Sequence, residues 1–477
     1  MGPFLERLAL PLLRLRPHRP SSRRLHQPRR PGADRCRSPV DDARGGRAIQ
    51  GERQAVPGAY AQHRGRRDPQ GLLALLQPRP PARAARHGRL SGAVREGRRH
   101  GPRGGLTAMV TPLRIDVPQA KLDRIAARLA LSEVGYAPED DADWRYGTDA
   151  RWLAGLLDHW RTRYDWRRCE AALNRLPHFR TRIDGIDIHF IHVRGAGPAR
   201  PFPLLLTHGW PGSVLEFLGV IEPLAAMGFD LVIPSLPGYG FSSRPPRPIG
   251  PAGVARLWRR LMTEALGYPR FGAQGGDWGS AVTAALGAGH GDVVSAIHLN
   301  LFMAPPATDG DDAETAAYRQ KLSAIQLRES AYMMEHATKP QTIGLALADT
   351  PLGFAAWVCE KFHGWGDTGG DIESRFPKDW LLDNIMTYLV NDAVQSAIWM
   401  YHTIFTEARP GERIEVPTGL ALYPAEFMPY PPRSAAERAF NVADWQEMRA
   451  GGHFAALEEP AAFADNVGRF FAQISQG

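Results

Sequence analysis

A glycine-flanked aspartate in the middle of the chain sets the strongest limit on how this sequence can fold. The stretch RFGAQGGDWGS carries Asp277 between Gly275 and Gly276 on one side and Gly279 on the other, directly after a short apolar run. This pattern predicts a strand, a sharp turn and a helix, because glycines tolerate strained dihedral angles and close packing. The turn would aim the Asp277 carboxylate into a pocket near a helix N-terminus, which favours an anion. The alternative is a glycine-rich loop in which Asp277 only caps the helix.

Apolar runs that end in glycine or proline recur on both sides of this turn. They predict strands at PFPLLLTHG, FDLVIPSLPGYG, RFGAQGGD, SAIHLNL (295–301), TGLALYPAE (418–426) and WQEMRAGGH (445–453). Because these strands alternate with helical stretches, we predict an α/β fold with a mostly parallel sheet and helices on both faces. Between 303 and 412 the strands stop and aromatic residues are frequent, so we expect an inserted helical lid over the sheet's C-terminal edge.

A helical and hairpin segment precedes this core. The spacing of Leu122, Ile125 and Leu129 predicts one amphipathic helix, and TDARWLAGLLDHWRTRY predicts a second. Asp184 and Gly185 separate two alternating runs, which predicts a β-hairpin. The expected parts are a disordered basic segment (1–108), an N-terminal extension (109–200), the first part of the core (201–302), the lid (303–412) and the second part of the core (413–477).

Residues 1–108 differ in composition from the rest. They contain 24 Arg, no Lys and seven acidic residues, whereas the other 369 residues contain 34 Lys and Arg against 43 Asp and Glu. The basic charge therefore belongs to the first segment, and the rest gives no case for nucleic-acid binding. Three interpretations of 1–108 stay open: a basic tail that binds acidic partners, a targeting segment, or GC-rich DNA translated upstream of a true start at Met109. We favour the last, because folded-protein patterning begins at Met109.

Cysteine spacing and hydropathy bear on the location of the protein. Cys36, Cys169 and Cys359 are sparse, form no CxxC pair and show no metal-ligand spacing. A disulfide framework is not expected, which is typical of a reducing cytoplasm. No apolar run reaches the ~18 residues that a membrane span needs, so no membrane anchor is expected from the sequence.

The stretch THGWPGS follows a predicted buried strand. In a fold of this kind, the loop after an early strand supplies backbone N–H groups to an oxyanion hole. His208 and Gly209 open the loop, and Trp210 can donate its N–H whereas Pro211 has none. The second donor would be the N–H of Trp278, the residue after Asp277, which is the candidate nucleophile. Two tryptophans that only pack on turns are the alternative.

A histidine and an acid in the right chain order complete a candidate triad. His453 in AGGHFAALEEP follows the last predicted strand, and Glu426 in LYPAEFM lies between Asp277 and His453. The order nucleophile, acid, histidine is the one this architecture requires. Other acids could take the place of Glu426, namely Asp383, Asp392, Glu458 and Glu459.

Together these motifs resemble a known family. HGWPGS, PSLPGYGFS, GGDWGS, ESAYMMEHATKPQTIG and GGHFAALEEP are similar to motifs of the microsomal-type epoxide hydrolases of the α/β-hydrolase superfamily. The segment from WRYGTDARW to IDGIDIHFIHV resembles that family's N-terminal domain. The resemblance runs from about Thr111 to the C-terminus. Mammalian members carry a membrane anchor that this sequence does not show, so a microsomal location is not expected.

The resemblance implies a role for each matching residue. Asp277 would be the nucleophile, Glu426 and His453 the charge-relay pair, and Tyr332 and Tyr401 the lid tyrosines that hold the epoxide oxygen. The implied reaction converts an apolar epoxide and water to a vicinal diol through an ester on Asp277, without metal or organic cofactor. Activity on cis-stilbene oxide and a detoxifying role are also implied.

Chemistry explains why an aspartate suits this reaction. An epoxide has no carbonyl group and needs attack at a saturated carbon, which an ionised carboxylate can make without losing a proton first. Haloalkane dehalogenases share the Asp–His–acid set, and Trp399 keeps that alternative open. A non-catalytic ligand-binding receptor on the same fold is an alternative of another class.

Overall fold

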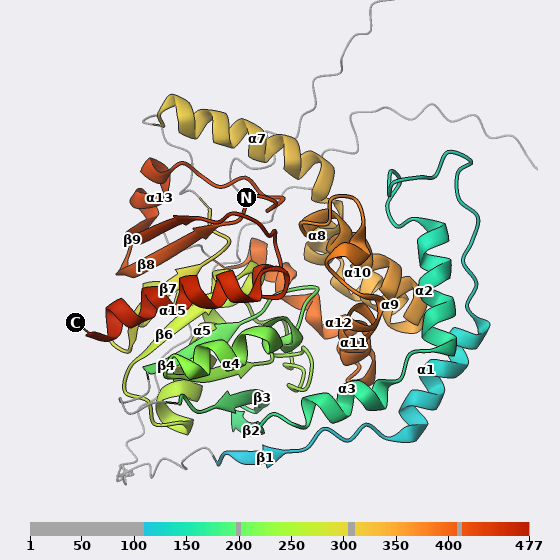
Figure 1. Ribbon diagram of the computed structural model, residues 1–477, viewed down its shortest axis with the longest axis horizontal. Helices are drawn as coiled ribbons and strands as arrows, with labels where there is room; N and C mark the ends of the chain where they lie inside the picture. Colours follow the sequence, from blue (N-terminus) through green and yellow to red (C-terminus); the bar gives the residue numbers. More distant parts are fainter. Residues whose placement is uncertain (1–108, 197–201, 304–310, 408–412, 477) are drawn as a thin grey trace, which may run out of the picture. The chain divides into compact units, whose positions relative to one another are not determined.

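One sheet runs through the part of the chain that the structure describes. The structure is a computed structural model that describes residues 109–196, 202–303, 311–407 and 413–476 (Figure 1), so the predictions for 1–108 lie outside it. The strand order is β1-β2-β3-β5-β4-β6-β7-β8-β9. The strands are β1 Thr111–Leu113, β2 His178–Ile183, β3 Ile186–Val193, β4 Phe202–Thr207, β5 Phe229–Pro234, β6 Phe271–Gly275, β7 Val294–Leu299, β8 Ile414–Leu422 and β9 Phe440–Glu447.

The centre of the sheet is parallel and is covered on both faces. Strands β4 to β9 pair in parallel, and every residue of β5 and β6 is buried. Helices α4 (Leu218–Ala226) and α15 (Pro460–Gln476) pack together on one face, and α5 (Pro251–Arg260) and α6 (Asp277–Gly289) pack on the other (Figure 1). Strands buried on both faces read as continuous apolar runs, which is why the sequence located them. The predicted fold class is confirmed.

The last two strands begin earlier than predicted. The expected strands 418–426 and 445–453 are β8 and β9, which end at Leu422 and Glu447. Strand β9 lies at the edge of the sheet and most of its residues are only partly buried, so its sequence lacks the apolar run that marks β5. His453 therefore lies in a loop after β9 rather than directly at the end of a strand.

The N-terminal extension joins both the sheet and the lid. The hairpin turns at Asp184 and Gly185, whose φ angles are 50° and 81°, and β3 then pairs antiparallel with β5. The predicted hairpin thus belongs to the main sheet, in which β1 pairs with β2 and forms the edge. Helices α1 (Gln119–Leu131), α2 (Ala150–Thr162) and α3 (Trp166–Leu173) contact the lid helices α10 and α11. The side chain of Asp149 caps α2, since it accepts the N–H groups of Arg151 and Trp152.

The described residues between β7 and β8 are helical. They form α7 Ala313–Glu329, α8 Ala331–Thr338, α9 Pro340–Asp349, α10 Pro351–Trp365, α11 Lys378–Val390, α12 Val394–Ala397 and a 3-10 turn at Trp399–Phe405. We call this segment the lid. In the described parts of the chain no single helix is long and apolar enough to cross a membrane, and α9 and α10 reach that length together only across a bend of 116°.

Candidate active site

Asp277 lies at a strained turn between β6 and α6. Its φ angle is 49°, a left-handed conformation that costs a residue with a side chain about 1–3 kcal/mol. A Cβ on Gly279 would overlap the carbonyl oxygen of Thr207 in β4, and a Cβ on Gly275 would overlap that of Gly279. Only glycine therefore lets α6 start this close to the sheet. The strand, turn and helix predicted for this stretch are all present.

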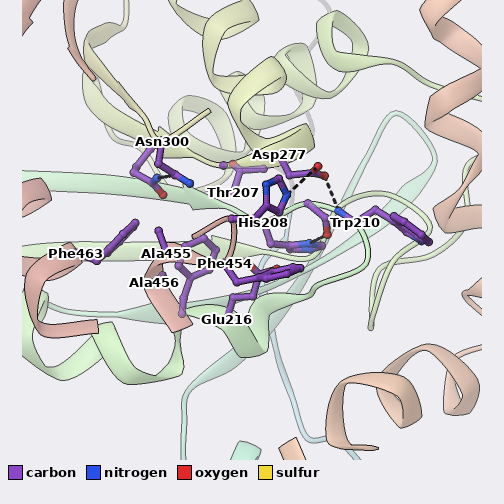
Figure 2. A pocket seen from close by; sticks show the side chains of 15 residues that line it. Thr207, His208, Trp210, Glu216, Asp277, Asn300, Phe454, Ala455, Ala456 and Phe463 are labelled. Atoms are coloured by element: carbon purple, nitrogen blue, oxygen red, sulfur yellow. Dashed lines mark hydrogen bonds and ion pairs between the residues drawn. The ribbon is translucent and has the colours of Figure 1, made fainter. Parts of the chain in front are cut away.

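The loop after β4 reaches the Asp277 carboxylate from the other side. The N–H of Trp210 donates to Oδ1 of Asp277 at 2.8 Å (Figure 2). Gly209 permits this approach, because a Cβ there would overlap the same oxygen. Within the described residues no hydrogen bond joins the Trp278 N–H to this carboxylate, so its share in an oxyanion hole stays a prediction.

The loop itself is braced by buried groups. Nδ1 of His208 donates to the carbonyl of Gly209 at 3.0 Å, and Nε2 accepts the N–H of Leu236 at 3.2 Å. Burial lowers the pKa of His208 to about 4, so the ring is neutral and fits this donor and acceptor pattern. The Trp210–Pro211 peptide bond is cis, and Asn384 of the lid donates to the Pro211 carbonyl at 2.8 Å.

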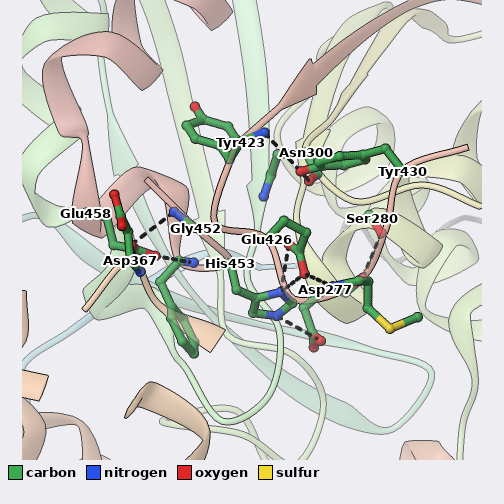
Figure 3. Close-up of polar contacts among 12 residues, drawn as sticks. Asp277, Ser280, Asn300, Asp367, Tyr423, Glu426, Tyr430, Gly452, His453 and Glu458 are labelled. Atoms are coloured by element: carbon green, nitrogen blue, oxygen red, sulfur yellow. Dashed lines mark hydrogen bonds and ion pairs between the residues drawn. The ribbon is translucent and has the colours of Figure 1, made fainter. Parts of the chain in front are cut away.

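His453 lies between two carboxylates. Its Nε2 is 3.3 Å from Oδ2 of Asp277, and its Nδ1 is 3.0 Å from Oε2 of Glu426 (Figure 3). The side chains of His453 and Glu426 are 2% and 1% exposed. Burial alone would lower the pKa of His453, but the charges of Glu426 and Asp277 outweigh it and raise that pKa well above its ordinary value. The structure thus brings together the three predicted triad residues.

The other acids considered for the triad have different partners. Asp383 accepts from Tyr164 at 2.8 Å, Asp392 pairs with Lys121, Glu459 pairs with Arg375, and Glu458 accepts the backbone N–H groups of Gly452 and Phe454. Glu458 thereby fixes the backbone on either side of His453. The lid contributes as well, since the N–H of His453 donates to the Trp365 carbonyl at 3.0 Å.

Aromatic rings of the lid face the loop of Trp210. The ring of Tyr332 stacks on Trp210 with centroids 5.4 Å apart, and Tyr401 meets Trp278 edge to face at 4.8 Å. The two tyrosine rings are 5.9 Å apart. Burial raises the pKa of both phenols well above the ordinary value, and the Asp277 charge acts in the same direction. Both side chains are therefore protonated donors at neutral pH.

The comparisons with known proteins agree with this arrangement. Residues 110–217 match the family described as epoxide hydrolase N terminus, and residues 203–320 match the alpha/beta hydrolase fold. Epoxide hydrolase 1 of Oryctolagus cuniculus is 32% identical over 409 residues, which cover 77% of this chain and 90% of that protein. The chain belongs to the epoxide hydrolase family. This confirms the resemblance and the enzyme class predicted from the motifs.

Solved structures support the same assignment for this epoxide hydrolase. The Aspergillus niger epoxide hydrolase superposes with a TM-score of 0.70 at 32% identity, covering 77% of this chain and 97% of that one. The juvenile hormone epoxide hydrolase of Bombyx mori gives a TM-score of 0.71 at 29% identity, with coverage of 77% and 95%.

A small cavity behind the triad contains groups that the sequence did not single out. Thr207, Glu216, Gln274, Asp277 and His453 are among its lining residues (Figure 2). Its volume of about 20 Å³ is room for one water molecule. Oγ1 of Thr207 and Oε1 of Gln274 are buried there without a hydrogen-bond partner in the described residues. A water would satisfy them.

Glu216 is the unexpected acid of this cavity. Burial raises its pKa to about 8, so the carboxyl group holds a proton at neutral pH. The signal for it was present in the sequence, because Glu216 is the only charged residue in the apolar run SVLEFLGVI. Among the residues described, no group of three or more His, Cys, Asp or Glu side chains could hold a metal ion.

Proposed function

We propose that this epoxide hydrolase opens an apolar epoxide through an alkyl ester on Asp277. The observation that carries the proposal is the position of the Asp277 carboxylate. It receives the N–H of Trp210 and contacts His453, and the ring of Tyr332 in the lid stacks on Trp210. This arrangement offers a nucleophile and a base, with the two lid tyrosines as candidate acids close to the loop of Trp210.

In the first step an oxygen of Asp277 forms a bond to an epoxide carbon. The C–O bond of the ring breaks, and the ring oxygen takes a proton from Tyr332 or Tyr401. The products are an ester of Asp277 that carries a free hydroxyl group, and a tyrosinate. The tyrosines matter because an alkoxide is a poor leaving group in water.

In the second step His453 takes a proton from water, and the hydroxide attacks the ester carbonyl carbon of Asp277. Formation of the ester removes one of the two carboxylate charges that raise the pKa of His453. The pKa of the ring therefore falls toward its ordinary value, so that the ring is neutral and free to accept a proton at the step that needs a base. The cavity beside Thr207 and Gln274 offers a place for the attacking water.

The tetrahedral intermediate then collapses. Its oxyanion would lie against the N–H groups of Trp210 and Trp278, and loss of one such donor typically costs ~10²–10³-fold in rate. The released alkoxide takes the proton from His453, which gives the diol. The second proton of the water, left on the Asp277 carboxyl, returns to the tyrosinate, so the enzyme is restored.

The proposed substrate class is supported by the aromatic rings that gather around Trp210. Trp210, Trp278, Tyr332 and Tyr401 offer apolar surface and two hydroxyl groups, which suits an apolar epoxide such as cis-stilbene oxide. We propose detoxification of such epoxides as the role. A cytoplasmic location is also proposed, supported by the free, buried thiols of Cys169 and Cys359. Fractionation of the native host with an antibody to the chain tests the location.

A single turnover of the full chain in ¹⁸O-water tests the mechanism. The panel contains cis-stilbene oxide, an alkyl epoxide and one haloalkane, and mass spectrometry follows the diol and the peptide with Asp277. We expect unlabelled diol and ¹⁸O in Asp277. Label that enters the diol directly and never Asp277 would mean that water attacks the epoxide itself.

Turnover of the haloalkane alone would instead favour a dehalogenase. The structure gives this alternative little support. Trp399, the residue that kept it open, makes no ring contact with Trp210, Tyr332 or Tyr401 within the described residues.

A further inference from the structure

A buried lysine lies against the tyrosine end of the lid. Lys361 belongs to α10 and is 7% exposed, which is rare for a lysine. Its Nζ lies 4.7 Å from the centroid of the Tyr332 ring and 5.6 Å from that of Trp365. The cation thus lies over the ring of one of the two tyrosines that face Asp277.

The partners of Lys361 are its neighbour in α10 and the end of α7. Nζ lies 2.5 Å from Oε2 of Glu360 and 3.6 Å from Oε2 of Glu329, the last residue of α7. These acids are 28% and 36% exposed, so each remains in contact with water. Lys361 is the most buried member of the cluster, and it is the member that touches Tyr332.

We propose that Lys361 is a positioning residue for ring opening: its charge stabilises the negative charge that builds on Tyr332 as this tyrosine gives its proton to the epoxide oxygen. The inference rests on the proposed function. Lys361 can speed ring opening only if its interaction with Tyr332 is stronger in the transition state than in the resting enzyme. A cation over an aromatic face meets this requirement, because the ring becomes richer in electrons when its hydroxyl group loses a proton.

The surroundings of Tyr332 disfavour a negative charge on its phenol. Burial and the carboxylates of Asp277, Glu329 and Glu360 all oppose a negative charge on Tyr332 and raise its pKa. A hydrogen bond with Tyr401 acts in the opposite direction and lowers the pKa of Tyr332. Among the described residues, Lys361 is the cation that lies over this ring. Without it, ring opening would place a buried negative charge among carboxylates.

A second role must be separated from this one. Lys361 also links α10 to the end of α7, so its loss could loosen the lid without any effect on charge. A purely structural role predicts slower ester formation, slower ester hydrolysis and lower stability together. A charge effect through Tyr332 predicts a change in ester formation alone.

The test compares Lys361→Met, Lys361→Arg and Glu360→Gln with wild type in the full chain, using cis-stilbene oxide. Rapid quench and mass spectrometry of the Asp277 peptide give the rates of ester formation and ester hydrolysis. Lys378→Met is the matched control, because Lys378 also pairs with a lid acid, Glu373, but lies over no tyrosine ring. Lys361→Gln replaces the Met variant if that variant does not fold.

We expect Lys361→Met to slow ester formation about tenfold and to leave ester hydrolysis within twofold, since the lost cation–π contact matters at the step in which negative charge builds on Tyr332. Lys361→Arg should restore most of the rate. Glu360→Gln, which removes the shorter of the two ion pairs but keeps the cation, should not slow ester formation. In a Tyr332→Phe background Lys361→Met should have no further effect.

Three results would overturn the inference: no change with Lys361→Met, an equal loss with Glu360→Gln, or an undiminished loss in the Tyr332→Phe background. A failure of the proposed function is seen separately. In that case wild type forms no ester on Asp277 at all, before any variant is compared.

Discussion

The two sides of Asp277 are held in different ways. On the core side, hydrogen bonds join the Trp210 N–H to the Asp277 carboxylate and the His453 ring to Glu426, and each bond fixes the orientation of its groups. On the lid side, Tyr332 and Tyr401 are placed by ring contacts of 4.8 to 5.9 Å, which constrain orientation less sharply. In the proposed mechanism this difference means that the core side supplies the nucleophile and the base, whereas the lid side supplies the acid and tolerates variation in substrate shape.

The largest effect should come from removal of the base on the core side. In His453→Gln the ester on Asp277 forms but is not hydrolysed, because no group accepts the proton of the attacking water. Turnover should fall by ~10⁴-fold or more, as for loss of a triad base. Mass spectrometry should show the Asp277 peptide carrying substrate.

His290→Gln, a histidine at the end of α6 away from the triad, is the matched control and should keep full turnover. Turnover at the wild-type rate in His453→Gln would show that His453 is not the base of ester hydrolysis. Absence of the trapped ester in an otherwise folded variant would remove Asp277 from its role.

The lid side should show the opposite split between the two steps. Tyr332→Phe and Tyr401→Phe should each slow ester formation about tenfold, and the double variant by ~10² or more, within the range of general acid catalysis. Ester hydrolysis should remain within twofold, because no tyrosine proton is needed there. Rapid-quench kinetics measures both steps.

Tyr146→Phe, at an exposed tyrosine of the N-terminal extension, provides the control. If either lid variant slowed hydrolysis as much as formation, the two sides of Asp277 would not be separable. If neither variant slowed formation, the acid would have to come from elsewhere in the enzyme.

The core side could be predicted from sequence largely because its signals are local. The glycines around Asp277 and the motif HGWPGS determine turns through their own backbone preferences. Chain order and the family resemblance favoured Glu426 from the sequence, but only contacts across the fold show that Asp383 and Glu458 have other partners.

The lid could be predicted as helical, but its contacts could not. Lys361 meets Tyr332 from a different helix, and nothing in EKFHGW indicates that the lysine points inward. The hairpin of the N-terminal extension was predicted, whereas its pairing with β5 was not, because strand pairing depends on long-range order. Edge strand β9 lacks an apolar run, so its predicted bounds lay several residues too far along the chain.

A smaller effect is expected at Glu216, which lines the cavity but is not a triad residue. The pKa of Glu216 in the folded chain is about 8, against an ordinary value of 4.5. Between these pH values the unfolded chain releases a proton that the folded chain keeps, so wild type loses stability as pH rises through this window. Glu216→Gln cannot ionise and should lose less stability between pH 5 and pH 8.

Thermal denaturation of both proteins across that range measures the difference. The exposed Glu222 in α4 supplies the control, and Glu222→Gln should follow wild type at every pH. Parallel curves for wild type and Glu216→Gln would mean that Glu216 is ionised at neutral pH. Ester hydrolysis should slow only a few-fold in Glu216→Gln, because His453 remains the base.

The smallest effect concerns the tolerance of the lid. Thr350 caps α10, and its Oγ1 accepts the N–H of Gly353 at 3.1 Å. Thr350→Ala should cost about 1 kcal/mol of stability, typical of a lost cap, and leave both rates within twofold. Ring contacts tolerate the small shift of α10 that a weaker first turn allows, whereas the hydrogen bonds around His453 would not. A change of more than twofold in ester formation by Thr350→Ala would show that the lid is held as tightly as the core, and the contrast between the two sides of Asp277 would then be wrong.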